Sequence, residues 1–200
     1  MPPAEDIQRY LLGAWRMMTG KRDAVRMLDI SVDGFWNSFF AIVVALPALL
    51  VGWVPLANEL AVPEARLVGR VLLVLRLAIV DIGSWVLPIA ALAAISGYVG
   101  IRDRFVAYVV ASNWASALFA WIMLPASLLR LVAPGLGEAA MALSLGIFLA
   151  SMVLLWRLTD AAIDKGPGVA TGVFAGMFMA SIPTLFALQD LLGIGTPMPS

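Results

Sequence analysis

Residues 77–98 read LAIVDIGSWVLPIAALAAISGY, an apolar run whose only charged side chain is Asp81. Its length matches the ~20 residues that a helix needs to cross a ~30 Å hydrocarbon layer. Because lipid offers no hydrogen-bond partner to backbone amides, such a run is predicted to be a helix. Four further apolar runs of similar length occupy residues 35–56, 105–129, 139–158 and 168–192. The sequence therefore predicts an all-α membrane protein, with five transmembrane helices forming one domain over residues 35–193.

The composition agrees with a membrane protein and disfavours several classes of enzyme. The chain of 200 residues is 62% hydrophobic and 13% charged, whereas soluble domains are about 45–50% apolar and about 25% charged. The formal net charge is zero, which gives no sign of a nucleic-acid partner. There is no Cys, which excludes disulfides, thiolate metal sites and cysteine nucleophiles. There is no His either, so the commonest general base and metal ligand is missing. We therefore expect neither a hydrolase nor a zinc enzyme, and no cofactor or metal.

Basic residues are distributed unevenly over the two sides of the predicted bundle. The N-terminal segment and the 2–3 and 4–5 loops carry nine Lys and Arg residues, and the other side carries four. The positive-inside rule then places the N-terminus in the cytoplasm and, with five spans, the C-terminus outside. Arg greatly outnumbers Lys in this Ala-rich chain, which fits a GC-rich bacterium. We expect a multi-pass protein of the bacterial inner membrane with a periplasmic C-terminus.

The segment before the first span, residues 1–34, is predicted to be cytoplasmic and to contain an amphipathic helix. Within AEDIQRYLLGAWRMMTG, residues 4–20, apolar side chains recur at helical spacing: Ile7, Leu11, Leu12, Trp15 and Met18. Such a helix can lie on the membrane surface or dock on the cytoplasmic ends of the spans, and the sequence leaves both open. A second short helix is expected over about 23–30, and Asp33-Gly34 is a turn signal before the first span. Residues 194–200 are expected to form a loose tail.

The loops predict which spans are neighbours. The 2–3 loop, Val99 to Arg104, is very short, so spans 2 and 3 are expected to pack as antiparallel neighbours. Residues 64–76, EARLVGRVLLVLR, alternate charged and bulky apolar side chains. We interpret them as an interfacial lead-in to span 2, with Arg76 extending to the outer head groups.

Small residues mark two helix faces. Span 5 carries Gly168, Gly172, Gly176 and Ala180, and span 4 carries Ala142, Gly146 and Ala150, in both cases at every fourth position. Small residues at this spacing let another helix backbone come close in a membrane. We expect spans 4 and 5 to pack on each other through these faces, and a homodimer face is the alternative.

Asp81 is the candidate for chemistry inside the membrane. If Arg76 marks the outer boundary, Asp81 lies about 7 Å below it at 1.5 Å per residue. A charge at this depth is costly and is not expected to face lipid. Arg76 is poorly placed round the helix to pair with it, so Arg130, at the outer end of span 3, is the better candidate partner. Two interpretations of Asp81 follow: it binds a proton or another cation, or it is a structural carboxyl group whose hydrogen bonds are made within the protein.

Two other polar positions are weaker candidates. Asn113, deep in span 3, is expected to make a hydrogen bond across helices and to lie about 10 Å from the depth of Asp81. Asp160 and Asp164 share a face after span 4 and could hold a cation. We expect instead a solvated pair balanced by Arg157 and Lys165.

A cytoplasmic N-terminal segment, five spans, short loops and an outside C-terminus resemble the Yip family of membrane proteins, including its bacterial relatives. The aromatic-rich start of span 3, Phe105 to Ser112, followed by Pro125, is similar to that family too, whereas Asn113-Trp114 and the short N-terminal segment depart from it. The resemblance covers residues 1–193 and implies a non-enzymatic adaptor or membrane organiser that binds another membrane protein. In eukaryotes it implies small-GTPase partners, for which no residue can be named.

Two other functions stay open. One is a small transporter, or a transporter subunit, with a polar site around Asp81. The other is a membrane enzyme acting on lipid through Asp160 and Asp164, which the lack of His and Cys disfavours.

Overall fold

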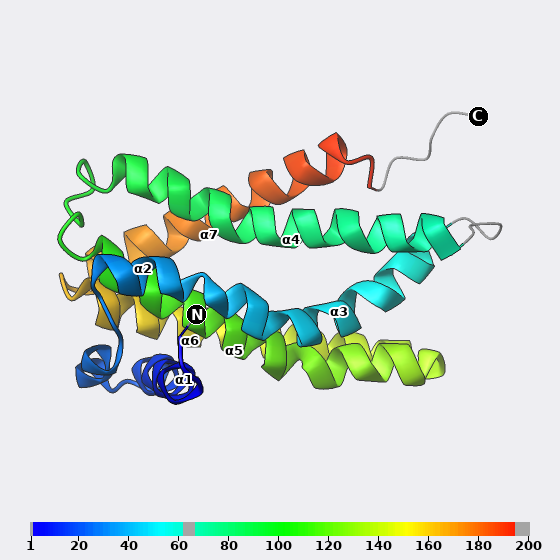
Figure 1. The fold of residues 1–200 in the computed structure, drawn as a ribbon, viewed down its shortest axis with the longest axis horizontal. Coiled ribbons are helices and arrows are strands. Elements are labelled where there is room, and N and C mark those ends of the chain that lie inside the picture. Colours follow the sequence, from blue (N-terminus) through cyan, green and yellow to red (C-terminus); the bar gives the residue numbers. More distant parts are fainter. Residues whose placement is uncertain (1, 62–66, 195–200) are drawn as a thin grey trace.

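A computed structural model of the chain describes residues 2–61 and 67–194, and the regular secondary structure of this part consists of helices, joined by short turns. Figure 1 shows long helices running side by side, with a smaller helical segment crossing them at one end. The elements are α1 (Ala4–Met18), the 3₁₀ helix η1 (Arg22–Met27), α2 (Val32–Ser38), α3 (Phe40–Leu60), α4 (Leu67–Ile95), α5 (Phe105–Val132), the 3₁₀ turn η2 (Pro134–Leu136), α6 (Gly137–Ile163) and α7 (Pro167–Leu191).

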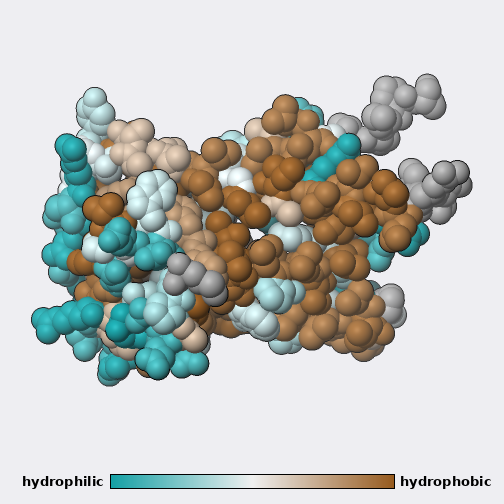
Figure 2. Space-filling view, viewed as in Figure 1, coloured by the Kyte–Doolittle hydropathy of each residue, from teal (hydrophilic) through white to brown (hydrophobic). Residues whose placement is uncertain are grey.

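The five predicted spans are confirmed as helices. Five helical stretches are long and apolar enough to cross a membrane, and α2 with α3 forms the first of them. Figure 2 shows hydrophilic residues gathered at the end of the molecule that holds α1, and mainly apolar residues over the rest of the same face. This surface is what a protein needs when its middle contacts hydrocarbon rather than water.

Helix α4 is longer than predicted. It begins at Leu67 rather than at residue 77, because the apolar residues between the charges of 67–76 continue the helix instead of forming a separate lead-in. Asp81 therefore lies midway between the ends of α4, about 21 Å from each end at 1.5 Å per residue. The rest of the predicted lead-in, with Pro63 before it, lies outside the described residues.

The five spans form a closed ring. Round the bundle, α3 packs against α5, α5 against α6, α6 against α7, α7 against α4, and α4 against α3. The predicted pairing of spans 2 and 3 is therefore wrong, since α3 lies between α4 and α5 (Figure 1). The short loop holds the ends of α4 and α5 together, but along most of their length each of them packs on α3 instead.

Helix α1 docks on the bundle. Ala14, Met17 and Met18 are fully buried, and the ring centroids of Tyr10 and Trp114 lie 5.4 Å apart. Figure 1 shows α1 nearly end-on while the spans run across the view, so α1 crosses the bundle axis. Docking, one of the two predicted alternatives, is what the structure shows. The docked face is rotated from the predicted one, because Leu12 and Trp15 remain 50% and 41% exposed.

The first span begins with a capped helix rather than after a turn. Ser31 is the N-cap of α2, and its Oγ accepts a hydrogen bond of 3.0 Å from the Gly34 amide, as N-cap serines do. Asp33 and Gly34, the predicted turn, lie in the first turn of this helix. A Cβ at Gly34 would overlap the backbone carbonyl of Asp29, so glycine is needed for this close approach.

The small-residue faces of α6 and α7 do not carry the contact between these two helices. Apart from the backbone of its own helix, a Cβ built on Gly146, Gly168, Gly172 or Gly176 would meet no atom of the described residues within 4 Å. Helices α6 and α7 do pack together, but through other residues. The periodic pattern identified residues that share a face, and the tertiary structure turns that face outward.

Candidate intramembrane binding site

A partly open cavity of about 450 Å³ lies between the five spans. Every span contributes to its lining: Leu49 from α3, Asp81 from α4, Ser116 from α5, Met152 from α6 and Phe174 from α7. The lining is mainly apolar, with a few hydroxyl groups and one carboxyl group. Largely apolar cavities of ~300–1,000 Å³ with a few placed polar groups are typical of small-molecule sites.

Asp81 is held in the wall of this cavity by an aromatic side chain. The indole Nε1 of Trp53, on α3, donates a hydrogen bond of 2.5 Å to Asp81 Oδ2. The predicted partner, Arg130, instead binds Glu59 at 2.9 Å, where the ends of α3 and α5 meet. The sequence does not predict the interaction of Asp81 with Trp53, because neither the spacing nor the charge pattern relates positions on different helices.

Ser84 lies one turn of α4 beyond Asp81 and lines the same cavity. Its Oγ is buried and has no hydrogen-bond partner among the described residues. A buried hydroxyl without a partner costs about 1–3 kcal/mol, so this atom is a candidate for contact with a ligand. Its position three residues after the acid was a usable signal, because residues at this spacing share a helix face.

Three other hydroxyl groups of the lining already donate a hydrogen bond within their own helix. Ser112 donates to the Val109 carbonyl at 3.0 Å, Thr159 to the Leu155 carbonyl at 2.8 Å and Ser181 to the Phe178 carbonyl at 2.8 Å. A hydroxyl that donates within its own helix still has lone pairs to accept a hydrogen bond. These groups therefore offer the cavity acceptors rather than donors.

Aromatic rings form much of the remaining wall: Trp85, Tyr108, Phe148, Phe174 and Phe178. Phe148 on α6 and Phe178 on α7 are also 41% and 37% exposed, so the lining reaches accessible surface on these two neighbouring helices.

Asn113 fixes one of these rings from behind the wall. The fully buried amide accepts a hydrogen bond of 2.9 Å from Trp85 Nε1 and donates one of 2.8 Å to Ser38 Oγ. The predicted bonding across helices is thus confirmed, and it joins α2, α4 and α5. Asn113 itself is not part of the lining, so its role is to position Trp85.

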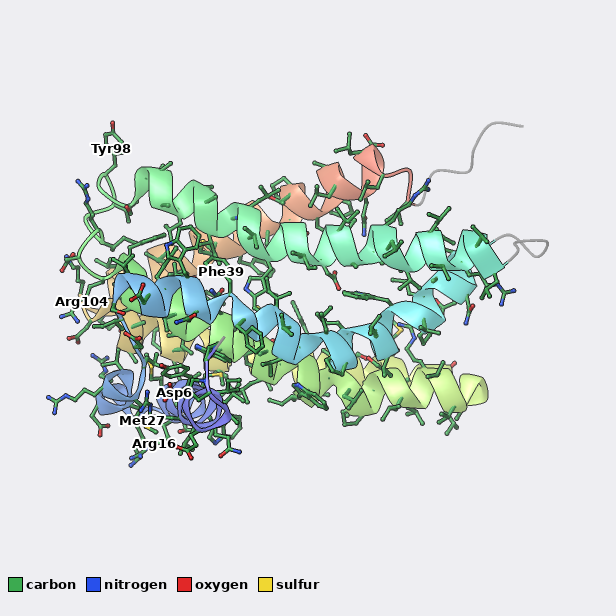
Figure 3. All side chains as sticks on the ribbon, viewed as in Figure 1. Asp6, Arg16, Met27, Phe39, Tyr98 and Arg104 are labelled. Carbon is green, nitrogen blue, oxygen red and sulfur yellow. The ribbon has the colours of Figure 1, made fainter. Side chains whose placement is uncertain are left out.

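The acids after span 4 belong to an ion-pair cluster at the polar end. Asp160 pairs with Arg22 of η1, and Asp164 lies 3.6 Å from Arg22 and 3.5 Å from Arg104. Their partners are thus Arg22 and Arg104, and not Arg157 or Lys165 as expected. Figure 3 places Arg104 and Tyr98 at this end of the bundle.

Lys165 has a different role in the cluster. It binds Asp103 at 2.6 Å and the Gly100 carbonyl at 2.7 Å, and thereby ties the 4–5 loop to the 2–3 loop. The hydrogen bond from Lys165 holds the pKa of the Asp103 carboxyl below its ordinary value. Among the described residues no group of acids is arranged to hold a metal ion.

Comparison of the chain with protein-family models, curated proteins and solved structures finds no match.

Proposed function

We propose that this protein is a small membrane transporter, or a subunit of one, that binds its substrate in the central cavity. The observation that carries this proposal is that all five spans line one cavity, and that this cavity reaches Asp81. Asp81 lies in the apolar part of α4, about 7 Å along the helix from Arg76 at 1.5 Å per residue, and polar groups that face a cavity between membrane helices commonly mark a substrate path.

The energetics of Asp81 support a functional site. An acid within a membrane span costs up to roughly 3 kcal/mol on insertion scales, and the cost is largest at the centre of the bilayer. The hydrogen bond from Trp53 occupies one carboxylate oxygen, and no basic residue is among the described residues that line the cavity. A purely structural clamp needs neither the cavity nor the unpartnered hydroxyl of Ser84.

The chain contains no Cys, so single cysteines can test whether the cavity is accessible from water. We expect Ser84→Cys and Ser116→Cys to react in native membranes with a small, water-soluble methanethiosulfonate. Val153→Cys, on the exposed apolar surface of α6, is the control and should not react, because a thiol in hydrocarbon does not ionise to the reactive thiolate. Failure of both cavity positions to react, in protein that elutes as the parent does, would exclude an aqueous substrate site.

The proposed compartment is the bacterial inner membrane, with the N-terminus and the ion-pair cluster in the cytoplasm. The excess of basic residues on that side supports this orientation. A reporter fused after Ser200 tests it and is expected to be active only outside the cytoplasm.

The Yip-like adaptor remains a separate hypothesis. It requires a membrane-protein partner, which crosslinking in native membranes followed by mass spectrometry would identify. Recovery of the protein only as an uncrosslinked monomer would count against it.

A further inference from the structure

We propose that the cavity binds a lipophilic monovalent cation, an amine or quaternary ammonium or phosphonium group that carries apolar substituents. This inference rests on the proposed function, since it names the substrate class of the same cavity. It is carried by the charge, the hydrogen-bonding capacity and the aromatic content of the lining taken together.

Among the described residues that line the cavity, the one ionisable carboxyl group is that of Asp81, and its charge is negative. No Lys or Arg is among the described residues that surround the cavity. Trp53 bonds Asp81 Oδ2, which leaves Oδ1 for a ligand. A single carboxylate in a low-dielectric site favours one positive charge and disfavours an anion, which would have no basic residue to neutralise it.

The hydroxyl groups of the lining also favour a positively charged ligand. Three hydroxyl groups already donate hydrogen bonds to carbonyls of their own helices, namely Ser112, Thr159 and Ser181. Their oxygen lone pairs can still accept a hydrogen bond from a ligand. Ser84 Oγ has no partner among the described residues, so it can accept a hydrogen bond as well as donate one. The acceptors of the lining suit the N–H groups of an amine, or the partially positive C–H groups that surround a quaternary centre.

The remaining wall suits the apolar part of such a molecule. Aromatic faces attract cations within about 6 Å of the ring centroid, by about 2 kcal/mol or more when the site is desolvated. The cavity of about 450 Å³ is far larger than a bare ion or a proton requires, and its apolar walls would not solvate one. The ligand that fits both features carries a charge and a bulky apolar body.

The exposed lining residues offer such a molecule a route from the lipid. Phe148 and Phe178 line the cavity and are partly exposed on the adjacent helices α6 and α7. A lipophilic cation partitions into the membrane, so it can reach these residues without crossing the polar end of the bundle.

The test uses two probes of the same shape and opposite charge, tetraphenylphosphonium and tetraphenylborate. Each is titrated into the full-length protein in lipid nanodiscs, with empty nanodiscs measuring partition into lipid. We expect saturable binding of the phosphonium, and no saturable binding of the borate.

Variants then assign this binding to the cavity. Asp81→Asn should weaken phosphonium binding by about tenfold or more, corresponding to ~1.4 kcal/mol, while the amide oxygen can still accept the hydrogen bond from Trp53. Ser84→Ala is the second variant and should weaken binding severalfold without loss of folded protein. Asp190→Asn, at the exposed end of α7, makes the same chemical change outside the cavity and should bind as the parent does.

The outcomes separate the two proposals. Equal binding of both probes, tighter binding of the borate, or phosphonium binding that Asp81→Asn and Ser84→Ala leave unchanged would overturn the cation inference. The transport proposal would then stand as long as Ser84→Cys and Ser116→Cys react with the aqueous reagent. Absence of probe binding together with unreactive cysteines would overturn both.

Discussion

Asn113 shows how one polar side chain can organise several membrane helices. Its amide oxygen and nitrogen satisfy Trp85 and Ser38 on two other helices, and Ser38 Oγ in turn donates to the Phe35 carbonyl at 2.7 Å. In hydrocarbon such groups have no water to replace a lost partner. The position of the Trp85 ring in the cavity wall therefore depends on an amide that does not touch the cavity.

We predict that Asn113→Ala destabilises the protein by about 1–2 kcal/mol, since it leaves the Trp85 indole N–H without an acceptor and Ser38 Oγ without its donor. Unfolding by denaturing detergent, followed by circular dichroism, measures this change. Asn37→Ala, at an exposed position of α2, is the control and should change the stability by less than about 0.5 kcal/mol. If the two variants were equally stable, the network would have no energetic role.

Asp103 gives a prediction about pH at the polar end of the molecule. Its pKa is lowered in the folded protein by the hydrogen bond from Lys165, so the stability it contributes is present above its unfolded value of about 3.9. This contribution is lost as the pH falls through the folded pKa.

Asp103→Asn should therefore reduce the loss of thermal stability between about pH 5 and pH 2, the range in which this carboxylate becomes protonated. Melting curves of parent and variant over this range measure the difference, which should be small because the pair is exposed. Asp190→Asn serves as the matched control. Identical acid-side slopes for parent and Asp103→Asn would show that the loops are not coupled through this pair.

Among the elements, α1 combines a docked face with an exposed apolar edge. Gly13 allows the chain after α1 to come close, since a Cβ there would lie 3.1 Å from Met27 Cβ and 3.2 Å from Leu28 Cδ2. Figure 3 shows Met27 and Arg16 together in this region. Leu12 and Trp15 lie on the edge of α1 that the bundle leaves uncovered.

We predict that this edge contacts lipid at the cytoplasmic interface, where Trp is favoured. A spin label at Trp15→Cys should be relaxed more by lipid-soluble oxygen than by a water-soluble nickel complex. A label at Arg9→Cys, roughly 120° round the helix, should show the opposite preference. Preferential relaxation of both labels by nickel would place the whole outer surface of α1 in water.

The outward small-residue face of α7 gives a second prediction for an element. Gly176→Leu should leave the folded protein intact and should not lower its stability, because no atom lies within 4 Å of the added Cβ and Leu has the higher helix propensity by almost 1 kcal/mol. Detergent unfolding measures the stability, and sedimentation in detergent measures the mass. A lower mass for the variant than for the parent would support the homodimer alternative, whereas unfolding of the variant would contradict the outward placement.

At the scale of the whole molecule, the cavity exists because five helices close a ring instead of packing round a solid centre. A substitution that fills the cavity with a larger side chain should abolish ligand binding without unfolding the protein. Ser116→Phe should remain folded, because the cavity has room for the ring, and should lose binding of tetraphenylphosphonium. Ala150→Phe, on the exposed side of α6, is the matched control and should retain binding. Unchanged binding in Ser116→Phe would place the ligand elsewhere.

The membrane class of this protein and the positions of its helices follow from the sequence alone. Uninterrupted apolar runs leave the backbone no alternative to helices in lipid, so the five spans follow from local composition. The amphipathic pattern of α1, the depth of Asn113 in its span and the isolation of Asp81 in an apolar run could be recognised for the same reason, since each depends on neighbours along the chain.

The neighbours of each helix and the surroundings of Asp81 depend on how the helices pack in three dimensions. A short loop limits the distance between helix ends but not the course of the helices, so α3 could come between α4 and α5. Periodicity defines a face without its orientation, so the small residues of α6 and α7 could turn outward. The pairing of Asp81 with Trp53, the unpartnered Ser84 hydroxyl and the cavity depend on how the ring closes. That closure is set by contacts between residues far apart in the chain, for which local sequence carries no signal.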